Sequence, residues 1–355
     1  MKCIHCNNDC TYPNRSDKKC PTCRHAFAFE PRTGDKITDA GFQAAIDAVS
    51  SNGTVRFLPD HLYYELCRRK REKGVARTVV MSIAGLSLLG AVFAPLPSLI
   101  AAALLGTLGG VLWPTPTVAI PRAVFDVLWT RFVEVHGPPH GLIVRKKLER
   151  RASPHRVQDE MERYSFDRAV VCDRAATVDL LLANNFHFEN NCAVVSVDGY
   201  PVNAFATVRA MLNNNPRLSV YALHDATPEG CLLAHELASN PAWFHGRARV
   251  IEVGIRPAHA KKHRGVWIRA RSPQLAKTTH LTKSERAWLG DYALELAAIR
   301  PEQVIKRLFA AIASDADRKG ASEYVDIVSG GEYYVDGSSF DGDASTSDGG
   351  DDGFG

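Results

Sequence analysis

The sequence predicts a multidomain chain in which an α/β domain with a mainly parallel sheet follows several smaller units. Three observations lead to this fold class. Two closely spaced cysteine pairs open the 355-residue chain, a long uncharged apolar run lies in its first third, and short apolar segments alternate with helical patterns in its second half. A chain of this length commonly contains two or three domains.

The N-terminal cysteines form two Cys-x-x-Cys pairs, Cys3 with Cys6 and Cys20 with Cys23. Two such pairs across a short loop can place four thiolates tetrahedrally round one metal ion, an arrangement that suits zinc. A stretch of about 30 residues cannot bury a self-sufficient core, so metal binding would supply most of its folding energy. We predict a structural zinc ion in a small ribbon over residues 1–30 that resembles rubredoxin. His5 and Cys10 are close by, as substitute ligands or as bystanders.

A short mixed segment follows over residues 31–77. Apolar residues recur at helical spacing over 39–50, residues 54–58 alternate like a short strand, and Pro59 opens a second helical pattern. Helix, strand and helix in this order predict a short winged-helix-like segment.

No charged residue occurs over 78–121, and the stretch is rich in Leu, Ala, Val, Ile and Gly. Pro95 and Pro97 divide it into halves that are each near the lower limit for spanning a bilayer. Both flanks are basic, so the positive-inside rule places both ends in the cytoplasm. The run predicts a two-helix transmembrane hairpin in an integral membrane protein, with the N-terminus and C-terminal domain cytoplasmic, as at a bacterial inner membrane. The alternative is a buried apolar hairpin within a soluble fold.

Residues 122–163 read as a helical linker, and residues 164–312 as the α/β domain. Short apolar strands are expected at 169–172, 192–197, 218–223 and 249–253, with helices between them. Short apolar strands between helices indicate a parallel sheet, whose ligands gather beyond the carboxyl ends of the strands.

The remaining residues, 313–355, are rich in Gly, Ser and Asp towards the end. From Gly330 on, apolar residues are few and every charge is negative, which is typical of disorder, and we predict a disordered acidic tail over 313–355. Such a tail could shield basic runs, bind a basic partner, or only increase solubility.

Three motifs of the α/β domain carry a resemblance. One strand ends in Asp173, a second is followed by Gly199-Tyr200-Pro201, and a third by Asp225-Ala226-Thr227-Pro228-Glu229-Gly230. In order and spacing this resembles the Toprim domain of the A subunits of type IIB DNA topoisomerases and their meiotic recombination relatives. Upstream, Tyr64 in the segment LYYEL resembles the tyrosine with which that family attacks the DNA phosphate. The resemblance implies Asp173, Asp225 and Tyr64 as candidate catalytic residues and Mg²⁺ as a cofactor.

The sequence departs from that family at three positions. Asp173 stands where the family has a glutamate, and Thr227 replaces the second aspartate of the metal-binding pair. Asp60 stands where the family places an arginine near its tyrosine. Mg²⁺ prefers hard carboxylate ligands, so the loss of one weakens the predicted site. An alternative role for Asp225 is to cap the following turn and helix.

Two functional classes follow. The first is a non-catalytic, membrane-anchored zinc-binding protein whose Toprim-like domain binds nucleic acid, nucleotide or a protein partner. The second is a Mg²⁺-dependent phosphoryl-transfer enzyme, nuclease-like or topoisomerase-like, with a rearranged acidic site. The missing carboxylate at Thr227 favours the first class.

Overall fold

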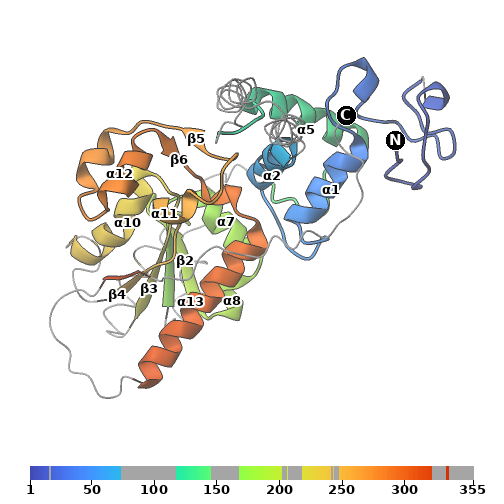
Figure 1. The fold of residues 1–355 in the computed structure, drawn as a ribbon. Coiled ribbons are helices and arrows are strands. Elements are labelled where there is room, and N and C mark those ends of the chain that lie inside the picture. Colours follow the sequence, from blue (N-terminus) through green and yellow to red (C-terminus); the bar gives the residue numbers. More distant parts are fainter. Residues whose placement is uncertain are drawn as a thin grey trace, which may run out of the picture.

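The computed structural model describes residues 1–15, 17–72, 117–144, 168–201, 218–240, 248–321 and 333–335, together with Ala206 and Trp243. Within these residues the chain forms a cysteine-rich N-terminal module, a three-helix unit and an α/β domain (Figure 1). The N-terminal module and the sheet lie at opposite ends of the molecule, with the three-helix unit between them.

The N-terminal module contains two short 3-10 turns, η1 (Pro13–Arg15) and η2 (Pro31–Thr33). The Arg15 side chain is buried and pairs with Glu30 at 2.9 Å. The Asp39 carboxylate accepts hydrogen bonds from the backbone N–H groups of Ala28 and Phe29, both at 2.9 Å. Because Asp39 begins the first long helix, these bonds fix the module against the three-helix unit.

The three-helix unit consists of α1 (Asp39–Val49), α2 (Pro59–Glu72) and α5 (Arg122–His136). Phe42 of α1 and Phe132 of α5 stack with ring centroids 4.5 Å apart in its core. The helices expected at 39–50 and from Pro59 are confirmed. In place of the strand expected at 54–58, only Phe57 forms a bridge, to Leu142. Helix α5 belongs to this unit and not to a separate linker, whose residues 145–163 lie outside the described residues.

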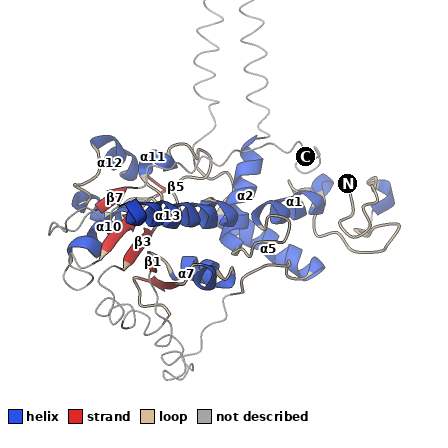
Figure 2. Ribbon diagram, turned by 90° about the horizontal axis from the view of Figure 1, so that it is seen from below, coloured by secondary structure: helices blue, strands red, loops and turns tan. Residues whose placement is uncertain are grey.

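The α/β domain is built on a parallel sheet of order β2-β1-β3-β4-β7 (Figure 2). Every neighbouring pair in it is parallel. Its strands are β1 (Arg168–Cys172), β2 (Cys192–Ser196), β3 (Ser219–Leu223), β4 (Arg249–Glu252) and β7 (Tyr333–Val335). The four strands expected from the sequence and their parallel arrangement are therefore confirmed.

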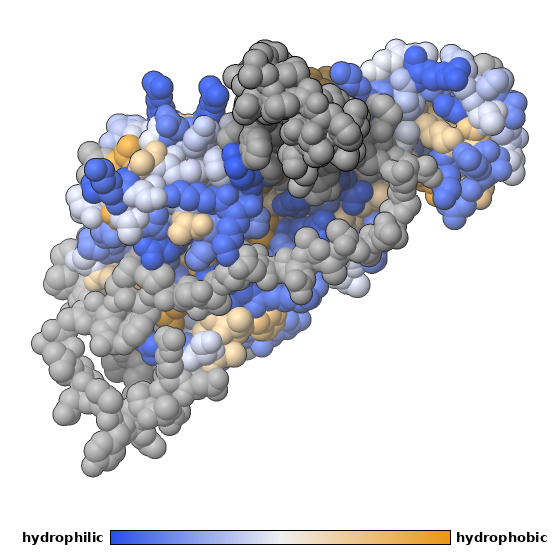
Figure 3. Space-filling view, in the orientation of Figure 1, coloured by the Kyte–Doolittle hydropathy of each residue, from blue (hydrophilic) through white to orange (hydrophobic). Residues whose placement is uncertain are grey.

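Helices cover both faces of this sheet, because its strands are apolar on both sides. Alternate strand residues such as Val170 and Tyr221 face α7 (Ala175–Ala183), α8 (Phe186–Glu189) and α13 (Pro301–Ala321). Their neighbours Val171 and Val220 face α10 (Pro228–Ser239). The sheet forms the buried middle layer, and the visible outer surface is largely hydrophilic (Figure 3).

Short elements connect β4 to α13. They are α11 (Pro257–Ala260), β5 (Ile268–Arg269), η3 (Pro273–Lys277), α12 (Lys283–Leu289), β6 (Tyr292–Ala293) and η4 (Leu296–Ala298). The domain also extends beyond residue 312. Helix α13 continues to Ala321, and residues 333–335 of the expected tail form β7. Residues 336–355 lie outside the described residues.

Two predictions require correction: the fold class that includes a transmembrane hairpin, and the localisation as an integral membrane protein. In the part of the chain that the structure describes, no helix has both the length and the apolar character needed to cross a membrane. Residues 78–116 of the expected hairpin lie outside that part. Its last residues pack against protein: Val118 N–H donates to Trp267 O at 2.9 Å, and Ile120 is buried. An uncharged run requires burial from water, and a protein interior meets that requirement too.

Candidate functional site

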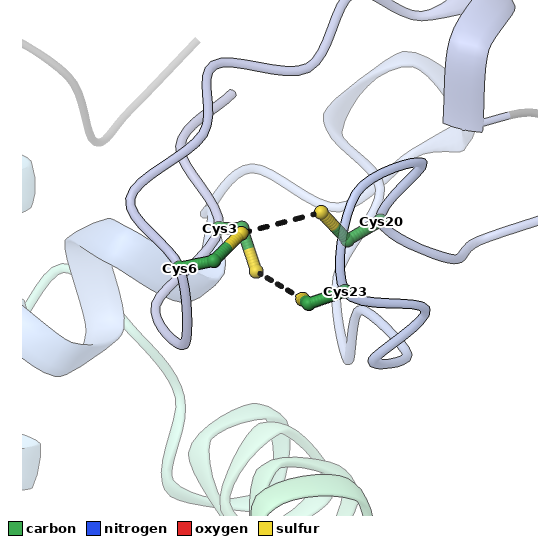
Figure 4. Close-up of side chains that lie close together, drawn as sticks. All are labelled: Cys3, Cys6, Cys20 and Cys23. Atoms are coloured by element: carbon green, nitrogen blue, oxygen red, sulfur yellow. Dashed lines mark hydrogen bonds between the residues drawn. The ribbon is translucent and has the colours of Figure 1, made fainter.

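The four cysteines of the two pairs lie together, as the sequence predicts (Figure 4). Their sulfur atoms are all within 4.8 Å of one another. Cys3 Sγ is 3.6 Å from Cys23 Sγ, and Cys6 Sγ is 3.6 Å from Cys20 Sγ, so each contact joins one pair to the other. Four thiols converging in this way could hold one metal ion.

Two equivalent backbone turns create this convergence. In the first, Asn7 N–H donates to Cys3 O at 2.9 Å; in the second, Arg24 N–H donates to Cys20 O at 2.9 Å. Asn7 and Arg24 each follow the second cysteine of a pair and have positive φ values of 56° and 62°. Each turn therefore reverses the chain directly after its two thiols and aims both at the other turn.

The two neighbouring candidates lie close to this group without belonging to it. Cys10 Sγ lies 3.8 Å from Cys20 Sγ, and burial raises the pKa of its thiol to about 11. Backbone hydrogen bonds from Cys23 and Thr22 lower the pKa of Cys20 to about 6. His5 stacks on His25, with ring centroids 3.8 Å apart. The cluster that could bind a metal contains neither Cys10 nor His5.

The second candidate site lies at the carboxyl ends of β1 and β3, where the strand order changes direction. Asp173 directly follows β1, and Asp225 comes two residues after β3. The Asp225 N–H donates to Asp173 Oδ2 at 2.8 Å. Asp225 Oδ1 accepts from Leu296 N–H at 2.6 Å. The structure thus brings the two predicted aspartates together and ties each to the backbone.

An arginine lies against this acidic pair. Arg174 Nε is 2.6 Å from Asp225 Oδ2, and Arg174 Nη1 donates to Glu295 Oε1 at 2.9 Å. Burial raises the pKa of Asp173, and burial together with the charge of Asp173 raises that of Asp225, while the charge of Arg174 opposes both shifts. Asp173 Oδ1 is buried and has no hydrogen-bond partner.

Tyr64, the third predicted site residue, reaches the same network from α2. Its side chain is buried, and its hydroxyl donates to Glu295 Oε2 at 2.8 Å. Burial and the Glu295 carboxylate raise the pKa of Tyr64. A phenol that is shielded from solvent and held neutral in this way is a poor nucleophile.

The positions at which the chain departs from the Toprim pattern have structural partners. Thr227 is the N-cap of α10, and its hydroxyl accepts from Gly230 N–H at 3.0 Å. The cap expected at Asp225 is therefore formed by Thr227. Asp60 pairs with Arg122 at 2.6 Å.

Sequence reasoning missed Arg174 and Glu295. Arg174 adjoins Asp173 and carries no motif of its own. Glu295 joins the site because Ala226 and Leu294 pair as an antiparallel bridge, a contact between distant segments that no local pattern signals. A small pocket lies at this place. Its lining includes Leu58, Asp60, His61, Arg174, Asp225 and Glu295.

Below the acidic pair lies a buried ion pair, His224 with Glu252, whose Nε2 and Oε1 atoms are 3.1 Å apart. Burial alone would lower the pKa of His224, but hydrogen bonding to Glu252 and its charge outweigh burial and raise it. The raised pKa predicts a stabilisation that is fully present below the ordinary histidine pKa of about 6.5 and is lost as pH rises through the folded-state value.

The variant His224→Gln removes this ion pair with Glu252. We expect the free energy of unfolding lost by this variant to be largest at mildly acidic pH and to shrink as pH rises. Denaturant titrations over a pH series would check this. His235→Gln, at an exposed histidine, serves as the control. A loss at His224→Gln that is independent of pH would contradict the expectation.

Comparison of the chain with protein-family models, curated proteins and solved structures finds no match.

Proposed function

We propose that this chain is a zinc-binding protein whose Toprim-like α/β domain binds a partner and does not cleave phosphodiester bonds. The observation that carries this proposal is the placement of Arg174 between Asp225 and Glu295, at 2.6 and 2.9 Å. A catalytic Mg²⁺ ion would need those carboxylate oxygens as ligands. Here a side chain of the protein supplies the positive charge instead.

The other positions support the same proposal. Tyr64 is buried and hydrogen-bonded to Glu295, so its hydroxyl is committed within the fold. Thr227 caps α10, and Asp60 pairs with Arg122. Each residue that would have to act on a phosphodiester has a structural role. The ligand classes that remain are nucleic acid, nucleotide and protein.

Zinc is the metal we propose for the four-cysteine cluster. Four sulfur ligands in two Cys-x-x-Cys pairs suit tetrahedral zinc and leave no open coordination position. The ion would therefore be structural and hold the N-terminal module together.

One observation favours a second candidate, a Mg²⁺-dependent phosphoryl-transfer enzyme. Asp173 Oδ1 is buried without a hydrogen-bond partner, beside the carboxylate of Asp225. A cation could satisfy that oxygen if Arg174 moved away.

Calorimetric Mg²⁺ titration and a plasmid nicking assay on the full chain separate the two candidates. We expect wild type to show neither saturable Mg²⁺ binding nor Mg²⁺-dependent nicking. The double variant Arg174→Met/Thr227→Asp is expected to gain Mg²⁺ binding, because it removes the resident cation and restores a carboxylate. Thr227→Asp with Arg174 retained is the matched control, since Asp caps a helix about as well as Thr. Nicking by wild type that Asp173→Asn or Asp225→Asn abolishes would establish the enzyme instead.

A further inference from the structure

Positive charge is concentrated in one segment of the α/β domain. Residues 256–286 contain nine Lys or Arg and one Glu, whereas the whole chain has a net charge of only +4. The one acidic residue, Glu285, is buried and lies 3.6 Å from Arg256. The segment therefore presents almost only positive charge to solvent.

Seven of these side chains are exposed, and we call them the basic surface. They are Lys262, Arg264, Arg269, Arg271, Lys277, Lys283 and Arg286. Several strongly hydrophilic residues protrude from the part of the molecule that carries α11, α12 and β5, among less polar ones (Figures 1 and 3). Asp291, beside the segment, is an exposed acidic neighbour.

The basic surface rests on a packed scaffold. Trp267 contacts Trp288 edge to face at a centroid distance of 5.3 Å, and its Nε1–H donates to Ala260 O at 2.8 Å. Lys261 Nζ donates to Ser284 O at 3.2 Å and so links the end of α11 to α12. These contacts hold α11, β5 and α12 as one body.

Spacing aligns the charges on this scaffold. Arg269 is the last residue of β5, and Arg271 follows two residues later, so these two exposed cations are close together in the chain. Lys283 and Arg286 are three apart on α12 and share a helix face. Paired cations on fixed elements suit a regular array of negative charges better than they suit an isolated anion.

We propose that the basic surface binds double-stranded nucleic acid through its phosphates, without reading its sequence. Four of the seven residues are arginines, whose planar fork of donors matches phosphate oxygens. Trp267, the one tryptophan of the segment, is buried, as is its neighbour Trp288, so neither offers the stacking platform by which single strands are held. Segments that bind a membrane surface combine basic residues with exposed apolar residues that insert into it. The exposed large apolar residues of the described chain all lie outside 256–286, so this composition favours nucleic acid over a membrane as the partner.

The proposal rests on the proposed function and names the partner class of the α/β domain, through residues other than those of the Asp173–Asp225 network. Duplex binding without nicking is the result that both proposals expect. Nicking would contradict the proposed function, whereas duplex binding that substitutions in the basic surface leave unchanged would contradict the present proposal.

The test is fluorescence anisotropy of a short labelled DNA duplex with the full chain at increasing salt. We expect log affinity to fall linearly with log salt, with a slope that becomes shallower by about 0.9 for each phosphate that a variant no longer neutralises. Arg269→Glu/Arg271→Glu and Lys283→Glu/Arg286→Glu should each weaken binding at least about tenfold at low salt, because each variant replaces two phosphate-binding cations by anions. Lys36→Glu/Arg56→Glu changes the net charge equally at exposed positions elsewhere and should bind nearly as wild type.

Metal content and melting temperature verify that each variant is folded, and glutamine replaces glutamate where reversal disturbs folding. Several results would overturn the proposal. These are equal weakening by the control pair, stronger binding to single strands, binding only to phosphatidylserine vesicles, and duplex binding that appears only after residues 336–355 are deleted. The last result would assign the basic surface to the chain's own acidic tail.

Discussion

Replacing Cys20 by serine is expected to abolish metal binding and to unfold the N-terminal module while the α/β domain stays folded. The module has few buried apolar side chains besides its cysteines, with Phe27 among them. A structural zinc ion contributes roughly 10 kcal/mol of apparent binding energy in modules of this size, and removing one of four ligands forfeits most of it. Elemental analysis should fall from one zinc per chain to nearly none, and hydrogen exchange should accelerate within residues 1–30.

Cys10→Ser is the matched control, because Cys10 Sγ lies only 3.8 Å from Cys20 Sγ yet belongs outside the four-thiol cluster. It should keep one zinc per chain. If Cys10→Ser loses the metal and Cys20→Ser retains it, the ligand assignment is wrong. If neither variant loses it, the metal is bound elsewhere.

The parallel sheet could be predicted from the sequence because its strands are buried on both faces. Residues 169–172 form a continuous apolar run, and residues 218–223 form one that only Ser219 interrupts, as expected of strands without a solvent-exposed face. The expected strand at 54–58 alternates correctly, but a strand also needs a neighbour, and only Phe57 finds one. Conversely, β7 contains the β-favouring residues Tyr333, Tyr334 and Val335 within a Gly- and Asp-rich tail that concealed them.

The two sites differed in how far sequence could predict them. The cysteine cluster follows from local spacing, since both turns are closed by bonds between near neighbours in the chain. The acidic network depends on contacts between distant segments: Tyr64 comes from α2, Arg174 from the end of β1, and Glu295 from the chain after β6. Motif order indicated the two aspartates, but the cation beside them and the carboxylate that joins Tyr64 to them required the fold. The transmembrane prediction used the composition of residues 78–121 alone. An uncharged apolar composition indicates that a segment avoids water, but it does not distinguish a lipid bilayer from a protein interior.

Gly254→Ala is expected to cause a large loss of stability in the α/β domain. A Cβ at Gly254 would lie 2.4 Å from His224 Cδ2 and 2.6 Å from the His224 backbone nitrogen. The ring is fully buried and fixed by Glu252, and Ile255 N–H donates to His224 O at 2.9 Å. Neither group can yield without separating the ends of β3 and β4, so we expect a destabilisation of about 3 kcal/mol, at the upper end for overpacking.

Gly290→Ala provides the comparison, because Gly290 has helical φ and ψ of −64° and −30°. Its nearest neighbour to a new Cβ, Ala287 O, is 3.3 Å away. Alanine there should change the unfolding free energy by about 1 kcal/mol or less, since the backbone already suits it. Denaturant unfolding of both variants decides the matter. Because Asp225 follows His224, Gly254→Ala should also disturb the ion pair between Asp225 and Arg174. If Gly254→Ala were as stable as Gly290→Ala, His224 would not lie against Gly254 as described. The placement of the adjoining Asp225 would then be wrong as well.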